Sequence, residues 1–341
     1  MSVITIVGAG MMGSAMSIPA SDNGHEVRLV GTPLDRAIIE RAKKDGYHIT
    51  LKRQLPENVK CYQVEELKTA LEGCDLLIGG VSSFGVEWFA ENVLPIIPRS
   101  LPVLSITKGL HADKDGKLVS FPDYMATKPG CDGLSLNAVG GPCISFELAD
   151  RHHTVVAFCG HNKDILGKIK SLLSTEYYHI NLTTDVIGIE TAVAMKNAYA
   201  LGVSLAIGLA ESKKGEGCPE EYNPQAGLFA QSTREMYKLL EIAGGDTHEI
   251  LFGAGDLYVT VFGGRTRRIG TLLGRGLTYA QAAEVLSGVT LESVAITKVV
   301  VEALEKNGKN LEEFPLLCHI YDMITKGITV DVPWDKFSCG I

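Results

Sequence analysis

The sequence predicts a two-domain protein in which a doubly wound parallel α/β sheet is followed by an all-helical domain. Short apolar, β-branched runs alternate with helical stretches through the first half of the chain, and from about residue 185 long helical stretches replace that alternation. A length of 341 residues exceeds what one hydrophobic core usually organises. We therefore expect an N-terminal domain over residues 1–185 and a helical C-terminal domain over residues 186–341.

The first element is an apolar run over residues 2–7, followed at once by Gly8-Ala9-Gly10-Met11-Met12-Gly13. This G-x-G-x-x-G pattern lies between an expected strand and an expected helix at residues 11–23, and a second strand is expected at residues 26–30. In that setting the glycines permit a tight turn, backbone approach to a pyrophosphate and close helix–strand packing, so the pattern predicts a Rossmann dinucleotide site. The residues expected to contact the dinucleotide are Gly8, Gly10, Met11, Met12 and Gly13.

The end of the second expected strand bears on the choice between NAD and NADP. NAD sites usually place Asp or Glu there, to bind the ribose hydroxyls. In this chain the strand ends in Gly31-Thr32-Pro33, Asp35 follows a few residues late, and Arg36 could bind a 2′-phosphate. Thr32 and Arg36 are therefore candidate cofactor contacts, and the cofactor is NAD or NADP.

The alternation continues beyond the first β-α-β unit. The strand expected at residues 103–106 runs directly into Lys108, which places this lysine at the carboxyl edge where open α/β sheets bind ligands. An ordinary exposed loop lysine is the alternative interpretation. The other elements expected in this half are strands at residues 75–81, 138–139 and 154–158 and a helix at residues 86–94.

The helical half begins with an apolar helix expected over residues 186–210, which carries Lys196 and Asn197. A lysine inside such a helix needs partners or a lowered pKa, which makes it a candidate proton donor; a side chain that reaches solvent from the helix edge is the alternative. The polar stretch at residues 211–223 is either a lid or a solvated linker. Further helices are expected at residues 225–243, 279–286, 291–306 and 313–326.

The segment from Gly255 to Arg268 sets a carboxylate, hydroxyl groups and clustered guanidinium groups between glycines. Because arginine presents a planar fork of donors that matches phosphate oxygens, the segment is a candidate site for a small anionic, phosphorylated ligand. The alternative is a solvated turn that opens a helix at residues 267–273, in which Asp256 would cap a helix or turn.

Composition argues against several other classes of function. A net charge of −8 disfavours nucleic acid and anionic membranes as partners, and charged residues interrupt the apolar helix, so no membrane insertion is expected. Eight cysteines without a C-x-x-C pair, and no secretory leader, favour a reducing, cytoplasmic compartment. The histidines lack metal-ligand spacing, so no metal site is expected.

Five segments occur together in an order typical of one family: Gly8 to Gly13, Thr107-Lys108-Gly109-Leu110, Gly141-Pro142 with Glu147, Ala194 to Ala200, and Gly255 to Arg265. By these segments the chain resembles the NAD(P)-dependent sn-glycerol-3-phosphate dehydrogenases, the soluble kind that reduces dihydroxyacetone phosphate, over nearly its whole length. The resemblance implies a Rossmann domain followed by a helical domain, with the substrate held between them, in a homodimer.

The resemblance also implies residue roles. Lys196 is the expected proton donor to the substrate carbonyl, and Lys108 is expected to hold the substrate oxygens. Asp256 and Thr260 would complete the polar network, while Asn197 and Arg265 would bind the phosphate end. Thr266, next to Arg265, is a further candidate substrate contact because it carries a hydroxyl group. These roles suit hydride transfer, because negative charge builds on the carbonyl oxygen and needs a positioned acid and nearby positive charge.

Two positions depart from the family pattern. Thr266 follows Arg265 where the family has Asn, and Gln225 stands where the family commonly has Lys. Three functions therefore stay open. They are reduction of dihydroxyacetone phosphate, reduction of another phosphorylated or carboxylated hydroxyketone such as a longer ketose phosphate, and dinucleotide sensing without catalysis.

Overall fold

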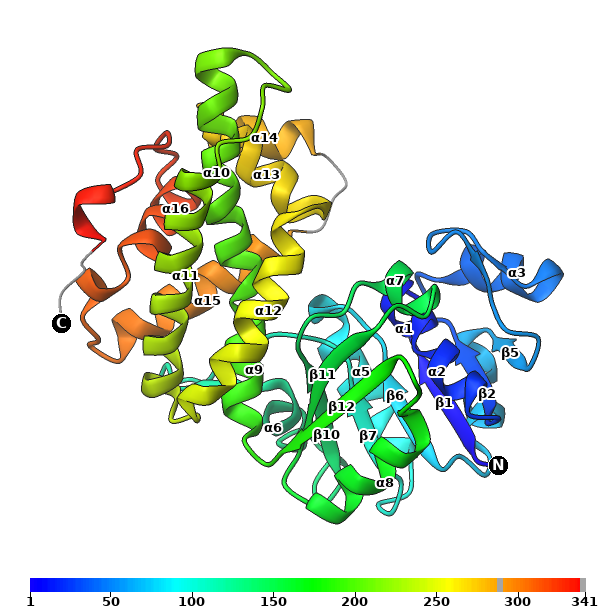
Figure 1. The fold of residues 1–341 in the computed structure, drawn as a ribbon. Coiled ribbons are helices and arrows are strands. Elements are labelled where there is room, and N and C mark those ends of the chain that lie inside the picture. The colour runs from blue at the N-terminus through cyan, green and yellow to red at the C-terminus, as the bar shows by residue number, and fades with distance from the viewer. Residues whose placement is uncertain (287–290, 338–341) are drawn as a thin grey trace. The chain divides into compact units, whose positions relative to one another are not determined.

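The computed structural model describes residues 1–286 and 291–337, and the chain divides into two compact units (Figure 1). The first unit comprises Met1–Lys108 and Ser120–Glu190, and the second comprises Gly109–Val119 and Thr191–Ile341. The expected fold class, a doubly wound sheet followed by a helical domain, is confirmed. The structure adds that residues 109–119, although they lie in the first half of the sequence, belong to the helical unit.

The first unit is built on an eight-stranded sheet of order β12-β11-β10-β7-β6-β1-β2-β5. Neighbouring strands run parallel except β10 and β11, which pair antiparallel with Ala138 opposite Cys159. The strands are β1 (Val3–Val7), β2 (Glu26–Val30), β5 (Val59–Tyr62), β6 (Leu76–Gly79), β7 (Val103–Ser105), β10 (Leu136–Gly140), β11 (Thr154–Cys159) and β12 (Tyr178–Thr183).

Both faces of this sheet are buried. In β6, Leu76 and Ile78 belong to one apolar cluster and Leu77 to the other, because successive side chains of a strand point to opposite faces. The helices of the unit are α1 (Met11–Ala15), α2 (Ser17–Asp22), α3 (Arg36–Asp45), α4 (Leu67–Leu71), α5 (Val86–Asn92), α6 (Phe121–Ala126), α7 (Ser145–Ala149) and α8 (Lys163–Leu173). A short hairpin of β3 (Tyr47–His48) and β4 (Arg53–Gln54) follows α3.

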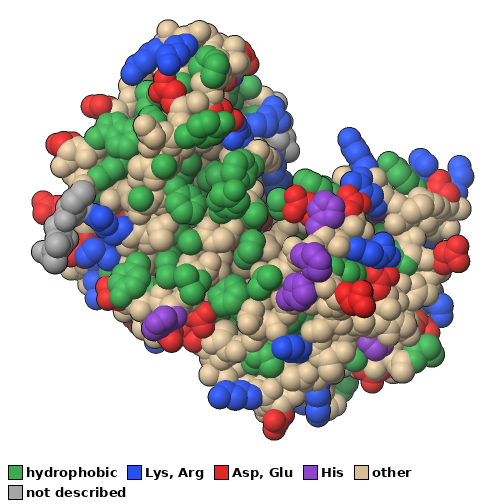
Figure 2. All heavy atoms as spheres, in the orientation of Figure 1, with side chains coloured by type: hydrophobic (Ala, Val, Ile, Leu, Met, Phe, Trp, Pro, Cys, Tyr) green, Lys and Arg blue, Asp and Glu red, His purple; other side chains and the backbone are tan. Residues whose placement is uncertain are grey.

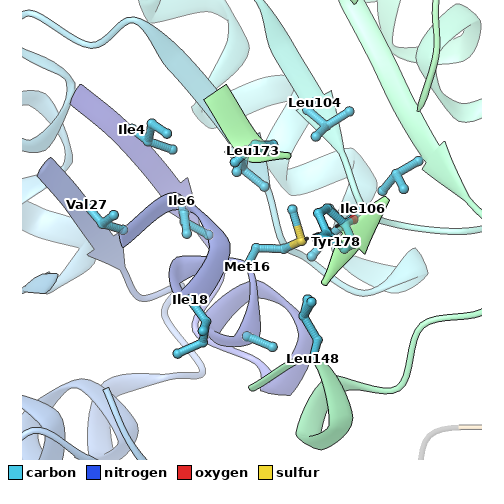
Figure 3. Close-up of a cluster of buried hydrophobic side chains, with 14 of the residues drawn as sticks. Ile4, Ile6, Met16, Ile18, Val27, Leu104, Ile106, Leu148, Leu173 and Tyr178 are labelled. Atoms are coloured by element: carbon cyan, nitrogen blue, oxygen red, sulfur yellow. Dashed lines mark hydrogen bonds between the residues drawn. The ribbon is translucent and has the colours of Figure 1, made fainter. Parts of the chain in front are cut away.

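The helix expected at residues 11–23 is interrupted at Met16, which separates α1 from α2. The Met16 side chain is 1% exposed and points into the apolar cluster shown in Figure 3. There the hydroxyl of Tyr178, from β12, lies 3.7 Å from the Met16 sulfur. This contact between the first helix and the last strand fixes the segment that follows the glycine turn.

The second unit packs around a central helix, α10 (Lys196–Lys214), whose residues from Ala198 to Gly208 are buried. Glycines bring α10 and α13 (Gly264–Gly274) into close contact, since a Cβ on Gly208 would lie 2.1 Å from the Thr271 carbonyl oxygen. The other helices are α11 (Tyr222–Ala243), α12 (Ile250–Val261), α14 (Tyr279–Val285), α15 (Glu292–Lys306) and α16 (Pro315–Thr325).

The apolar helix expected at residues 186–210 is instead two helices, α9 (Val186–Ala194) and α10, which meet at Met195. Within the described part of the chain, residues 186–214 form the single stretch long and apolar enough to cross a membrane. However, 83% of its most apolar window is buried inside the protein, as in the core helix of a soluble protein. The break matters for function because it places Lys196 in the first turn of α10.

The segment that joins the two halves of the first unit forms a hairpin, β8 (Leu110–Ala112) and β9 (Leu118–Ser120). Asn307, which ends α15, donates a side-chain hydrogen bond to the Gly116 carbonyl oxygen, and Lys306 donates to that of Lys114. These contacts explain why residues 109–119 belong to the helical unit.

Candidate active site

The glycine turn after β1 lies where the sheet changes its winding direction, because β1 pairs with β2 on one side and with β6 on the other. Gly8 has a φ of +114°, and a Cβ there would lie 2.5 Å from the backbone of Gly80, just after β6. A Cβ on Gly13 would lie 2.1 Å from the Gly8 carbonyl oxygen. Only glycine therefore lets turn, helix and strand approach so closely.

Gly10 differs from Gly8 and Gly13 because the position that a Cβ would take faces open space. A Cβ on Gly10 would have no atom of the described chain within 4 Å. Gly10 instead lines a cavity of about 410 Å³, together with Thr32, Asp35, Val81 and Trp88. A glycine backbone exposed to an open cavity at the switch point is what a pyrophosphate requires, so these residues fit a bound dinucleotide.

The two methionines of the turn are placed differently. Met11 is 47% exposed, whereas Met12 packs against the apolar core and lies 3.9 Å from the Cys143 sulfur. Met12 can therefore offer the ligand its backbone but not its side chain.

Of the other candidate cofactor contacts, Thr32 lines the cavity and Arg36 does not. The Thr32 hydroxyl donates to Asp35 at 2.7 Å, and the Arg36 guanidinium forms an ion pair with Glu65 instead. The acidic side chain that lines the cavity is thus Asp35, which lies a few residues beyond the end of β2, where NAD sites usually place an acidic residue.

Lys108 lies just beyond β7, at the carboxyl edge of the sheet. Its ammonium group donates to the Gly141 carbonyl oxygen at 2.7 Å, and the side chain is half-buried. Glu190, on α9, is fully buried, and neither of its carboxyl oxygens has a close hydrogen-bond partner within residues 1–286 and 291–337. Burial raises the pKa of Glu190 well above its ordinary value, and the positive charge of Lys108 opposes that shift.

In the helical unit, Lys196 and Asp256 form an ion pair. The Lys196 ammonium lies 2.8 Å from Oδ1 of Asp256, and the Asp256 side chain is 0% exposed. Lys196 therefore does not extend into solvent, and Asp256 lies inside α12 instead of capping a helix or turn. Thr260 follows one helical turn later, and its hydroxyl donates to the Asp256 carbonyl oxygen at 2.6 Å.

The candidate phosphate residues lie on two helices of this unit. Asn197 follows Lys196 in α10. Its side-chain amide donates a hydrogen bond to Oε2 of Glu292, at the start of α15, at 3.4 Å. Arg265, in the first turn of α13, is exposed and has no hydrogen bond or ion pair with the other described residues, while Thr266 is half-buried.

Of the two arginines that follow Arg265, Arg267 and Arg268, the first is held by contacts within the protein. Arg267 pairs with Glu220 at 2.6 Å and donates to the Val261 carbonyl oxygen. Gln225 donates to the same Glu220 side chain at 3.0 Å. These contacts link the loop at residues 215–221 to α13. The expected 211–223 loop is shorter than predicted, because residues 211–214 belong to α10 and residues 222–223 to α11.

Three residues of interest escaped the sequence reasoning. Glu190 carries the signal that marked Lys196, a charge inside the apolar helix, but it counted only against a membrane span. Glu292 lies at the start of a helix, where a glutamate is unremarkable. His48 is a single histidine after α3, yet it contacts the backbone of the glycine turn, 39 residues earlier, at 2.9 Å. No local signal in the sequence could have indicated that contact.

The fold and the two sets of polar residues define a class, the NAD(P)-dependent dehydrogenases. Residues 3–166 match the family model of the NAD-dependent glycerol-3-phosphate dehydrogenase N-terminus, and residues 185–334 match that of the C-terminus. The chain therefore belongs to the NAD-dependent glycerol-3-phosphate dehydrogenase family. It is an oxidoreductase that uses NAD or NADP.

Individual relatives agree with this assignment. An NADP(+)-dependent glycerol-3-phosphate dehydrogenase of Archaeoglobus fulgidus is 34% identical over 331 residues, which span 96% of this chain and 97% of the relative. A glycerol-3-phosphate dehydrogenase [NAD(P)+] of Lactococcus lactis is 29% identical and spans 89% of this chain and 86% of its own. The crystal structure of glycerol-3-phosphate dehydrogenase from Coxiella burnetii is 24% identical, covers 98% of this chain and 97% of its own, and superposes with a TM-score of 0.82, which supports the fold.

Proposed function

We propose that this protein reduces dihydroxyacetone phosphate to sn-glycerol 3-phosphate with NADH or NADPH. The observation that carries the proposal is the ion pair between Lys196 and the buried Asp256, at the start of α10. The two relatives named above are glycerol-3-phosphate dehydrogenases, and the match to the Archaeoglobus fulgidus protein extends over almost the whole of both chains. A dinucleotide sensor without catalysis has no need of an ammonium held in this way.

In the proposed reaction Lys196 donates its proton to the substrate carbonyl oxygen. The bound nicotinamide supplies the hydride, and the carbonyl oxygen gains negative charge as the hydride arrives. Asp256 holds the Lys196 ammonium and compensates its charge in a site from which water is largely excluded. Lys108 would hold the substrate oxygens and add positive charge near them, and positioned acid catalysis of this kind contributes roughly 10² to 10⁴ in rate.

The phosphate end of the substrate would be bound by Asn197, Arg265 and Thr266. Arg265 supports this role because its guanidinium is exposed and has no partner among the residues that the structure describes. Arg267, in contrast, is held by Glu220 and the Val261 backbone, so it does not replace the missing asparagine at position 266. A hydroxyl at Thr266 can still donate one hydrogen bond to a phosphate oxygen.

The substrate assignment is tested by following NADH and NADPH oxidation at 340 nm with three carbonyl compounds. These are dihydroxyacetone phosphate, dihydroxyacetone without the phosphate, and a longer ketose phosphate. We expect turnover with the first, and much higher KM with the second because Arg265 has no anion to bind. Activity confined to the longer ketose phosphate would contradict the proposed substrate, and no turnover with any of the three would favour a sensor.

We also propose that the protein is a cytoplasmic homodimer. Figure 2 shows hydrophobic side chains gathered over the face of the helical unit that α11 and α12 form. Exposed on these helices are Tyr237 at 42%, Leu251 at 73%, Tyr258 at 57% and Phe262 at 62%, and exposed apolar patches of this kind mark interaction sites. No disulfide joins the described cysteines, which suits a reducing compartment, and Cys339 lies outside the described residues. Sedimentation equilibrium would decide the subunit count, and a monomer would contradict this proposal.

A further inference from the structure

His48 is a fully buried histidine whose two ring nitrogens both make hydrogen bonds. Nδ1 lies 3.0 Å from the Leu51 backbone N–H, which can only donate, so Nδ1 must be the unprotonated acceptor. Nε2 therefore carries the ring proton, and it donates this proton to the Ala9 carbonyl oxygen at 2.9 Å. The geometry thus selects the neutral ring with the proton on Nε2.

Ala9 is the residue between the first two glycines of the turn, and its other backbone polar atom is also held by a side chain. The Ala9 N–H donates to Oδ2 of Asp35 at 3.1 Å. The same Asp35 oxygen accepts from the Thr32 N–H at 2.8 Å and from the Thr32 hydroxyl at 2.7 Å. Two segments distant in sequence, at residues 35 and 48, therefore hold the turn from its N–H side and its carbonyl side.

We infer that His48 is a positioning residue for the dinucleotide, because it holds the Ala9 carbonyl and so presets the turn on which Gly10 faces the cavity. This rests on the dinucleotide site assigned above. A turn held in its binding conformation before the ligand arrives loses less entropy on binding, so the hydrogen bond from His48 contributes to affinity although its ring does not touch the ligand.

Protonation of His48 would leave the bond from Nε2 to Ala9 in place but would disturb the contact that orients the ring through Nδ1. A proton on Nδ1 would face the Leu51 N–H, and a buried donor would lose its acceptor. Burial lowers the pKa of His48 below its ordinary value of 6.5, and the hydrogen bond to Ala9 and the charge of Asp35 oppose that shift. Because the pKa in the folded protein is the lower one, the contribution of neutral His48 to folding stability is complete above about pH 6.5 and is lost as the pH falls through the folded-state pKa. The orientation of the ring against the glycine turn weakens over the same fall in pH.

Two substitutions separate the hydrogen bond from the titration. His48→Leu removes the donor to Ala9, whereas the amide nitrogen of His48→Gln can replace Nε2 and does not titrate. His319→Gln is a matched control, because His319 is also a buried histidine with a pKa lowered by burial, but it lies in the helical unit. The readout is the dissociation constant of NADH and NADPH without substrate, measured by nucleotide fluorescence from pH 5 to 8, with circular dichroism to confirm folding.

We expect His48→Leu to weaken dinucleotide binding roughly tenfold at pH 8, the equivalent of one hydrogen bond, with kcat at saturating dinucleotide nearly unchanged. His48→Gln should bind nearly as tightly as the wild type and should lack the weakening at acid pH, while His319→Gln should follow the wild type throughout. Wild-type affinity in a folded His48→Leu protein would overturn the inference. Should His48→Leu not fold, an unchanged acid limb in His48→Gln would overturn it. A wild-type protein that binds neither nucleotide would refute the dinucleotide site itself.

Discussion

The ammonium of Lys196 lies 2.8 Å from Oδ1 of Asp256, and the aspartate is 0% exposed while the lysine side chain is 15% exposed. The two members of this pair are therefore unequal. The carboxylate is inaccessible, whereas part of the lysine side chain remains accessible. Lys196 lies in the first turn of α10, whereas Asp256 lies in the middle of α12.

Asp256→Asn should destabilise the protein and reduce turnover. The substitution leaves the Lys196 ammonium without its compensating charge in a nearly buried position, which costs roughly 3 kcal/mol of unfolding free energy. Asp322→Asn is the matched control, since Asp322 forms an exposed pair with Lys326 at 2.8 Å and should change stability by less than about 1 kcal/mol. Urea unfolding measures both variants, and equal losses would show that the Lys196–Asp256 pair is no more important than a surface pair.

Substitutions of Gly13 and Gly10 should separate the effect of the turn on folding from its effect on dinucleotide binding. Gly13→Ala places a Cβ against the Gly8 carbonyl oxygen and should lower the unfolding free energy by roughly 1 to 3 kcal/mol. The Cβ of Gly10→Ala meets no atom of the described residues within 4 Å, so the substitution should leave stability within about 0.5 kcal/mol, yet weaken dinucleotide binding at least roughly tenfold. Thermal melts and nucleotide titration check the pair. Unchanged nucleotide affinity in Gly10→Ala would mean that the cavity beside Gly10 is not the pyrophosphate site.

Arg265→Met should raise the KM for dihydroxyacetone phosphate roughly a hundredfold, because a charge-assisted bidentate contact to the phosphate is lost. Turnover of dihydroxyacetone, which has no phosphate, should not change. Arg268→Met is the neighbouring control on the same helix and should have little effect on either substrate. If the Arg268 variant shows the larger loss, the phosphate site is misplaced by one helical turn.

Glu235 predicts a pH dependence of stability. This carboxyl on α11 is 0% exposed, accepts from the backbone N–H groups of Leu316 and Leu317, and burial raises its pKa from 4.5 to about 7. Because the folded protein prefers the protonated form, the stability gained from Glu235 is complete below pH 4.5 and is lost as the pH rises toward 7. The loss is at most about 3 kcal/mol.

The comparison with Glu235→Gln isolates this effect, since glutamine does not titrate. The difference in unfolding free energy between wild type and variant, measured in urea, should shrink between pH 5 and 8 as the wild-type carboxyl ionises. A difference that stays constant over this range would show that Glu235 keeps one charge state throughout.

Much of the fold could be predicted because it rests on local patterns. The largely apolar runs of β1 and β6 and the glycine turn predict a parallel sheet, since strands buried on both faces read as near-continuous apolar segments. The break at Met195 could not be predicted, because neither Gly nor Pro marks it and Met195 keeps helical backbone angles, φ −73° and ψ −15°. The transfer of residues 109–119 to the helical unit depends on long-range bonds to Lys306 and Asn307, which no local pattern encodes.

The residues of the candidate site also divide into those that a local pattern indicates and those that depend on long-range contacts. Lys196 stood out because a charge in an apolar helix is costly, and the family resemblance named Asp256 as a member of the same network. Glu190 carries the same local signal as Lys196, whereas His48 did not stand out, because its significance lies in burial and in a contact 39 residues away in sequence. Arg36, chosen for its position after the second strand, is instead paired with Glu65 and does not line the cavity.

The most direct test of the role of Lys196 is the kinetics of Lys196→Ala with dihydroxyacetone phosphate, measured together with its dinucleotide affinity. We expect kcat to fall roughly 10²- to 10⁴-fold, as for the loss of a positioned proton donor, with the NADH or NADPH dissociation constant nearly unchanged. An unchanged kcat would contradict the assignment of Lys196 as the proton donor.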